Sequence, residues 1–198
     1  MAPENSSVLY HRGILSTTLE TWRFRQAARF IPSDAAVLDV ACNLGRLSEF
    51  LPENSDYTGV DISPAAIHRA KSHYPQRRFI IADLEDPVKE IVQQFNAITM
   101  LAFLEHVSSP ARVIQDLLPL LKPEGIIIAT TPAPISRKIH DVGAAMGLFS
   151  RSAADEHHQF LNKEALFQIG IQNGLTIAHF ERFMFGLNQL ICYRKGIH

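Results

Sequence analysis

Three aspartates stand at or near the ends of three successive apolar segments, and their spacing predicts a binding crevice for a nucleoside. They are Asp39, Asp61 and Asp83. In an open α/β sheet, ligands bind at the carboxyl ends of parallel strands, near the point where strand order reverses. Asp61 follows the first turn by about 20 residues, where an acid can accept both ribose hydroxyls. Asp83 can accept a hydrogen bond from an adenine amino group, with Leu84 packing on the ring. Taken singly, Asp61 could cap a helix and Asp83 could be a solvated loop acid, so the prediction depends on the whole set.

The turn within "VLDVACNLGRLSEFL" (37–51) has the outline of a nucleotide-binding turn but lacks two of the usual glycines. Ala41, Asn43 and Gly45 occupy the three alternate positions. Asparagine is among the few non-glycine residues that tolerate a left-handed backbone, and alanine has the smallest side chain that could leave room for a ligand. The turn can therefore be built, at some cost in strain. An ordinary strand-to-helix turn is the competing interpretation.

The elements that would position these residues follow from apolar patterning. A first helix is expected over 14–31, with Leu15, Leu19 and Trp22 on its buried face. The predicted strands are 35–41, 57–62, 78–84, 96–103, 126–130, 175–183 and 188–194. Helices are expected after the first strand (Leu47, Phe50, Leu51), after Ser63-Pro64, after Asp86-Pro87 (Val88, Ile91, Val92), after Ser109-Pro110 (Val113, Leu117, Leu121) and over 163–173, between Asn162 and Gly174.

Five strands that alternate with helices imply a parallel sheet with helices on both faces. The last two strands form a closing hairpin around Gly186. We therefore predict one α/β domain over 1–198, with an N-terminal helical segment (1–33) and an irregular insert or lid (131–160) over one end of the sheet.

Bulk composition narrows the class of protein. The chain has 198 residues, 46% of them hydrophobic and 20% charged, as in an ordinary globular domain. Lys plus Arg (19) nearly equals Asp plus Glu (20), so no field of one sign favours nucleic acid or an anionic membrane. Two cysteines and an N-terminus without an apolar h-region lead us to expect a cytoplasmic protein.

Six motifs together resemble the class I S-adenosylmethionine-dependent methyltransferases, in particular the small single-domain group that includes quinone-biosynthesis O-methyltransferases. The motifs are "VLDVACNLG", "YTGVDIS", "IIADLED", "FLEHVSSP", "LLKPEGIIIATTP" and "HHQFLNKEALFQIGIQNGL", and the resemblance extends over nearly the whole chain. The resemblance implies a three-layer αβα, Rossmann-like fold with a mostly parallel seven-stranded sheet and an antiparallel C-terminal strand. It also implies S-adenosylmethionine as the cofactor.

The resemblance assigns the cofactor contacts as well. The acid and turn of the first motif would frame the methionine part, the second motif would hold the ribose, and the third the adenine. The fourth strand would line the methionine side, and a basic residue of the N-terminal helix would lie near the cofactor carboxylate. The residues concerned are Asp39, Ala41, Asn43, Gly45, Asp61, Ile62, Asp83, Leu84, Met100, Leu101 and Arg23.

The chain departs from some quinone-type relatives at a metal-binding acid, which they place three residues before a Glu-His pair. Here that position is Ala102, ahead of Glu105-His106, so no metal site is expected. Glu105 and His106 could simply be strand-end and helix residues. The missing glycines of the first turn would weaken cofactor affinity.

Methyl transfer requires an acceptor aligned with the sulfonium and shielded from water. A hydroxyl acceptor also needs a nearby base, for which His158 and His106 are the candidates. Apolar residues in 141–150, among them Met146 and Phe149, could line a pocket for a small, partly hydrophobic molecule. They could equally pack on the sheet or form a homodimer contact.

The chain lacks the Asn/Asp-Pro-Pro-aromatic signature of enzymes that methylate base amino groups, which argues against a nucleic-acid substrate. Two other functions stay open. A nicotinamide-dependent oxidoreductase would use Asp61 in the same way, but G-x-G-x-x-G is absent. A non-catalytic adaptor that keeps the fold with a decayed site would explain the sequence "ACNLG".

Overall fold

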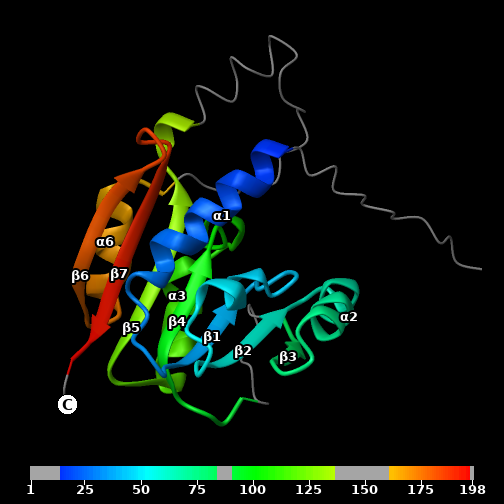
Figure 1. Ribbon diagram of the computed structural model, residues 1–198. Coiled ribbons are helices and arrows are strands. Elements are labelled where there is room, and N and C mark those ends of the chain that lie inside the picture. Colours follow the sequence, from blue (N-terminus) through cyan, green and yellow to red (C-terminus); the bar gives the residue numbers. More distant parts are fainter. Residues whose placement is uncertain (1–13, 84–90, 137–160, 197–198) are drawn as a thin grey trace, which may run out of the picture.

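A seven-stranded sheet lies between two layers of helices (Figure 1). The computed structural model describes residues 14–83, 91–136 and 161–196. The helices are α1 (Ile14–Ala28), α2 (Pro64–His73), α3 (Pro110–Leu117) and α6 (Lys163–Gln172), with 3-10 turns η1 (Arg46–Phe50), η2 (Leu104–His106) and η3 (Leu118–Leu120). The strands are β1 (Ala36–Val40), β2 (Asp56–Asp61), β3 (Arg78–Ile81), β4 (Phe95–Leu101), β5 (Leu121–Pro132), β6 (Leu175–Phe183) and β7 (Asn188–Lys195).

The strand order is β3-β2-β1-β4-β5-β7-β6, and β7 alone runs antiparallel to its two neighbours. This arrangement confirms the predicted fold class. The chain passes from β1 to β2 on one side, whereas β4 pairs with the other side of β1. Strand order therefore reverses between β1 and β4, and the carboxyl ends of these two strands mark the expected ligand position.

Two hydrophobic clusters cover the two faces of the sheet. Neighbouring residues of β1 point to opposite faces, so Val37 belongs to one cluster and Leu38 to the other. The cluster around Leu38 includes residues of α3 and α6, and the cluster around Val37 includes residues of α1 and α2. Burial on both faces explains why the parallel strands read as continuous apolar runs.

The inner face of α1 differs from the prediction. Leu19 and Trp22 are 39% and 37% exposed, so the expectation that they form a buried face is wrong. The half-buried residues Glu20, Arg23 and Phe24 face the domain instead. The reason is that α1 lies over polar groups near the carboxyl ends of the strands, where Arg23 hydrogen-bonds a residue of β7.

Proline sets several element ends that the apolar pattern did not place. The segment after β1 is a short 3-10 turn rather than a longer helix, and it stops before Leu51-Pro52. α3 stops two residues before Pro119, so Leu121 begins β5 and is not helical. Residues 91–94 are not helical, and Val92 is 93% exposed.

The capping predictions hold in part. The side chains of Ser63 and Asn162 cap α2 and α6, whereas Ser109 precedes α3 without a side-chain capping bond.

Within the described ranges, no helix combines the length and apolar character needed to cross a membrane.

Candidate active site

The turn after β1 keeps a glycine-type backbone at all three alternate positions. Ala41, Asn43 and Gly45 have φ values of 56°, 49° and 71°, all in the left-handed region. The turn is closed by the Gly45 N–H, which donates to the Cys42 carbonyl at 2.8 Å. Asn43 is exposed, so its side chain does not fill the interior of the turn. Ala41 and Asn43 therefore adopt, at some cost in strain, the left-handed backbone that glycine adopts most readily.

Asp61, at the carboxyl end of β2, fastens the turn to the sheet. Its Oδ2 accepts a hydrogen bond from the Asn43 N–H at 2.8 Å, and its Oδ1 accepts one from the Ser63 N–H at 2.9 Å. Each carboxylate oxygen can accept a further hydrogen bond. The contacts fix the orientation of the Asp61 carboxylate, as recognition of two adjacent hydroxyls requires.

We expect Ala41→Gly to stabilise the protein by about 0.5–1 kcal/mol, because glycine relieves left-handed strain that exceeds its cost in unfolded-state entropy. Chemical denaturation of the variant measures this gain. Ala111→Gly, in the first turn of α3, is the control, and it should not stabilise the protein, because glycine has a lower helix propensity than alanine. Equal losses in both variants would contradict the assigned backbone conformation at Ala41.

Asp39 is buried beneath the turn rather than open to a ligand. Its two oxygens accept hydrogen bonds from the Tyr57 and Thr99 hydroxyls, both at 2.7 Å. Burial raises the pKa of Asp39 to about 6, against the opposing effect of these two hydrogen bonds. The side chain thus ties β1 to β2 and β4 and supports the turn from below.

The pKa of Asp39 predicts a pH-dependent stability. Because the folded value, about 6, lies above the ordinary 3.8, the native state binds the proton more tightly than the unfolded chain. The contribution of Asp39 is fully present below pH 4 and is lost as the pH rises through 6. Between pH 7 and pH 5, the wild type should gain about 1 kcal/mol that Asp39→Asn lacks. Denaturant titrations at both pH values test this, and identical pH profiles would contradict it.

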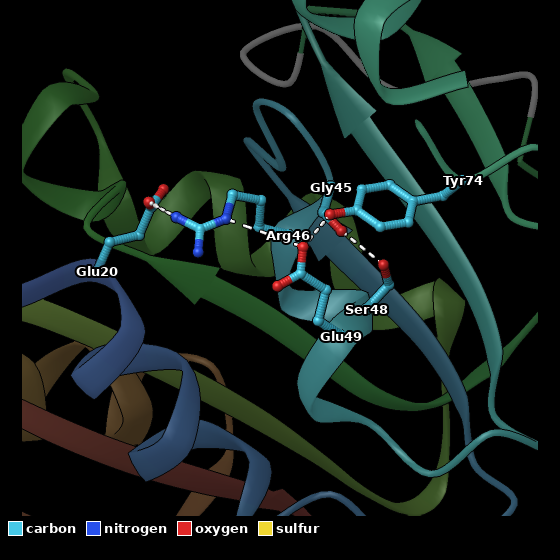
Figure 2. A network of polar contacts seen from close by, with 6 residues as sticks. All are labelled: Glu20, Gly45, Arg46, Ser48, Glu49 and Tyr74. Atoms are coloured by element: carbon cyan, nitrogen blue, oxygen red, sulfur yellow. Dashed lines mark hydrogen bonds and ion pairs between the residues drawn. The ribbon is translucent and has the colours of Figure 1, made fainter. Parts of the chain in front are cut away.

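A polar network joins α1 to the residues that follow the turn (Figure 2). Arg46 Nη1 contacts Glu20 Oε2 at 2.6 Å, and Arg46 Nε lies 4.0 Å from Glu49 Oε1. Glu49 also accepts a hydrogen bond from the Tyr74 hydroxyl, at the C-terminal end of α2. Because the Arg46 and Glu20 side chains are about four-fifths buried, their ion pair is shielded from solvent and helps to place α1 over the site.

Glu105 lies beyond the carboxyl end of β4, in η2, and is 1% exposed. Neither of its carboxylate oxygens has a hydrogen-bond partner on another described residue. Burial raises its pKa to about 7, against the opposing effects of its own backbone amide and of the positive charge of Arg23. Arg23 in turn donates from Nε to Asn188 Oδ1 at 3.2 Å.

The remaining predicted residues divide into three groups. Ile62 is 64% exposed and Asp83 is exposed, both beyond strand ends on the β2–β3 side. Met100 is fully buried in the core, whereas Leu101 and His106 are half-buried. Leu84, His158 and most of the predicted lid lie outside the described residues. No group of three or more potential metal ligands occurs in the part of the chain that the structure describes.

Sequence reasoning missed the partners of two site residues. Tyr57 and Thr99 bind Asp39 from neighbouring strands, and Asn188 binds Arg23 from a position 165 residues away. The strand pairing signals the contact with Thr99, since Asp39 is in register with Thr99. Tyr57 is in register with Val37, so the pairing alone does not signal its contact with Asp39. No local pattern signals the contact between Arg23 and Asn188.

The fold is that of the class I S-adenosylmethionine-dependent methyltransferases. A methyltransferase from Methanosarcina mazei, described as S-adenosylmethionine-dependent, superposes with a TM-score of 0.64 over 86% of this chain and 96% of that one, at 18% identity. A magnesium protoporphyrin IX methyltransferase from Synechocystis, solved with S-adenosylhomocysteine bound, superposes with a TM-score of 0.66 over 91% and 83%, at 18% identity. Residues 13–179 match the family described as a methyltransferase domain, so the chain belongs to that family, and the resemblance drawn from the sequence is confirmed.

Curated relatives agree with this assignment. The chain is 33% identical, over 149 residues, to a ubiquinone biosynthesis O-methyltransferase from Coxiella burnetii. A Xanthomonas axonopodis protein of the same name is 34% identical over 110 residues. The matches cover 71% and 53% of this chain but only 63% and 46% of those relatives.

Proposed function

We propose that the protein transfers the methyl group of S-adenosylmethionine to a small, partly hydrophobic acceptor. The observation that carries the proposal is the left-handed turn at Ala41, Asn43 and Gly45, fastened by the carboxylate of Asp61. Its backbone path is the one that glycines would give. A decayed adaptor site has no need to keep this strained path, so the geometry favours a working cofactor site.

The residues around the turn fit the chemical groups of the cofactor. Asp61 has an oriented carboxylate for the ribose hydroxyls. The exposed side chain of Ile62 offers an apolar surface for the adenine ring, with Asp83 as acceptor for its amino group. Arg23, on the inner face of α1, supplies a positive charge for the cofactor carboxylate. When bound, the sulfonium supplies an already activated methyl group, and the chain has to orient the acceptor and exclude water.

The acceptor class rests on the relatives. The ubiquinone biosynthesis O-methyltransferases are named for oxygen methylation in a quinone pathway, which supports a hydroxyl acceptor on a partly hydrophobic molecule. For such an acceptor, the sequence proposes His106 and His158 as bases. A nicotinamide-dependent reaction has no support in the family match. The near balance of Lys and Arg with Asp and Glu supports the proposal that nucleic acid is not the substrate. The cytoplasmic location stays a prediction.

A methyl-label assay tests this proposal. The protein is incubated with S-adenosylmethionine that carries a radioactive methyl group and with a metabolite extract. In one reaction the extract contains its macromolecules, and in a parallel reaction they have been removed. The proposal predicts label in a product that passes from water into an organic solvent. Label confined to acid-precipitated protein or nucleic acid, or no transfer at all, would contradict it.

A further inference from the structure

The unpartnered carboxylate of Glu105 is the most costly polar group among the described residues of the site. A buried carboxylate loses its hydration, and for Glu105 only its own backbone amide and the positive charge of Arg23 offset this loss. Gln189, the nearest comparable case in the site region, leaves only its Oε1 atom unpartnered, because its amide nitrogen donates to Thr131 and Leu161. Glu105 leaves both oxygens unpartnered. Such a group is explained when a ligand donates to it during function.

The place of Glu105 in the fold is where the reaction would occur. β4 forms one side of the strand-order reversal, and the chain turns sharply at its end, where Ala102 has φ 55° and donates from its N–H to the Thr130 carbonyl at 2.8 Å. η2 follows this turn and packs on β5. Asp61 and the left-handed turn lie on the β1–β2 side of the same reversal. A cofactor held at Asp61 would lie at this reversal, and Glu105 lies on its β4 side.

We propose that Glu105, in place of the two histidines named from the sequence, accepts the proton that the methyl acceptor loses, and that the charge of the cofactor sets the timing of this step. The inference rests on the proposed function. While the sulfonium is present, its positive charge favours the ionised carboxylate. Once the methyl group has left, the product is a neutral thioether and that attraction disappears. The affinity of the carboxylate for a proton thus rises as the acceptor releases one.

The step balances in atoms and electrons. The acceptor oxygen forms a bond to the methyl carbon, and the carbon–sulfur bond breaks with both electrons going to sulfur. The acceptor's O–H proton passes to a Glu105 oxygen, and it leaves to solvent after the product has departed. No oxidant, reductant or metal is required.

Few charged groups face Glu105. From α1, Arg23 acts on it directly, and Glu20 acts on Arg23. Its own turn adds His106, which has an interaction of its own. At the carboxyl end of β5, which contacts η2, Thr130 and Thr131 are uncharged. Arg23 is thus the one fixed positive charge that acts on Glu105 among the described residues, and a bound sulfonium would add a second.

Calorimetric titration of the full chain with S-adenosylmethionine and with S-adenosylhomocysteine tests this inference without any acceptor. The two ligands share the adenosine, amino and carboxylate groups and differ at sulfur, so their difference in proton release isolates the effect of the sulfonium. Titrations in buffers with different ionisation enthalpies give the number of protons released. Because the pKa of Glu105 is about 7, we expect S-adenosylmethionine to release roughly half a proton more than S-adenosylhomocysteine at pH 7.

Two variants assign the released proton. Glu105→Gln should abolish the difference between the ligands, whereas Glu124→Gln, an exposed glutamate near the start of β5, should keep it. Equal proton release by both ligands in the wild type would overturn the inference even if Glu105→Gln failed to fold, and so would a difference that persists in Glu105→Gln. If neither ligand binds the wild type, the proposed function itself fails, and this inference fails with it.

Discussion

Replacing Asp61 with alanine is expected to lower the affinity for S-adenosylhomocysteine by at least about 100-fold, because hydrogen bonds to a charged group contribute about 1.5–3 kcal/mol each. The variant would lose the acceptor of both ribose hydroxyls. It would also lose the acceptor of the Asn43 and Ser63 N–H groups, so the turn itself would be less well fixed. Both effects weaken binding. The measurement is isothermal titration of the variant with S-adenosylhomocysteine.

Asp56→Ala is the matched control, because Asp56 is an aspartate at the opposite end of the same strand, where it accepts a hydrogen bond from Gln93. We expect this variant to bind as the wild type does. Circular dichroism of both variants shows whether the fold is kept. Unchanged affinity in Asp61→Ala, with the fold intact, would remove Asp61 from the binding site.

Gly45→Ala is expected to destabilise the protein by about 2–4 kcal/mol, through left-handed strain and overpacking combined. A Cβ at Gly45 would lie 2.5 Å and 2.7 Å from two carbon atoms of the Phe79 ring. That ring is 5% exposed and packs edge-on against Tyr57, with ring centroids 5.8 Å apart. It therefore has little room to move. Denaturant unfolding measures the loss, and cofactor affinity should fall with it.

Gly174→Ala separates the two contributions. Gly174 has nearly the same backbone angle, φ 67°, but a Cβ there would meet nothing within 4 Å. It should cost only about 1 kcal/mol, the value for left-handed strain alone. Equal losses of stability in the two variants would mean that the Phe79 ring does not limit the space for a side chain at position 45.

The sheet could be predicted because its signals are local. Apolar runs bounded by turn residues placed all seven strands, and the switch to a closing hairpin around Gly186 placed the antiparallel strand β7. Several strand ends and helix ends differ from the prediction, because they depend on single residues. For example, α3 ends at Leu117, before Pro119, and a 3-10 turn follows, although the apolar spacing continues through to Leu121.

The site was predictable only in part, for a physical reason. The left-handed tolerance of Asn43 is an intrinsic backbone property, so the turn could be predicted from composition. The inner face of α1 could not be predicted in this way, because burial there is decided by the ion pair of Glu20 with Arg46 and by the hydrogen bond of Arg23 to Asn188. The isolation of Glu105 is a property of packing, and no sequence pattern shows that both its oxygens lack partners.

The most direct measurement of the central claim is a titration of the wild-type chain with S-adenosylhomocysteine. The left-handed turn and Asp61 predict saturable binding at one site per chain, with a dissociation constant in the micromolar range. Absence of binding at millimolar concentration, with the protein folded, would contradict the claim that a turn with one glycine out of three still holds this cofactor.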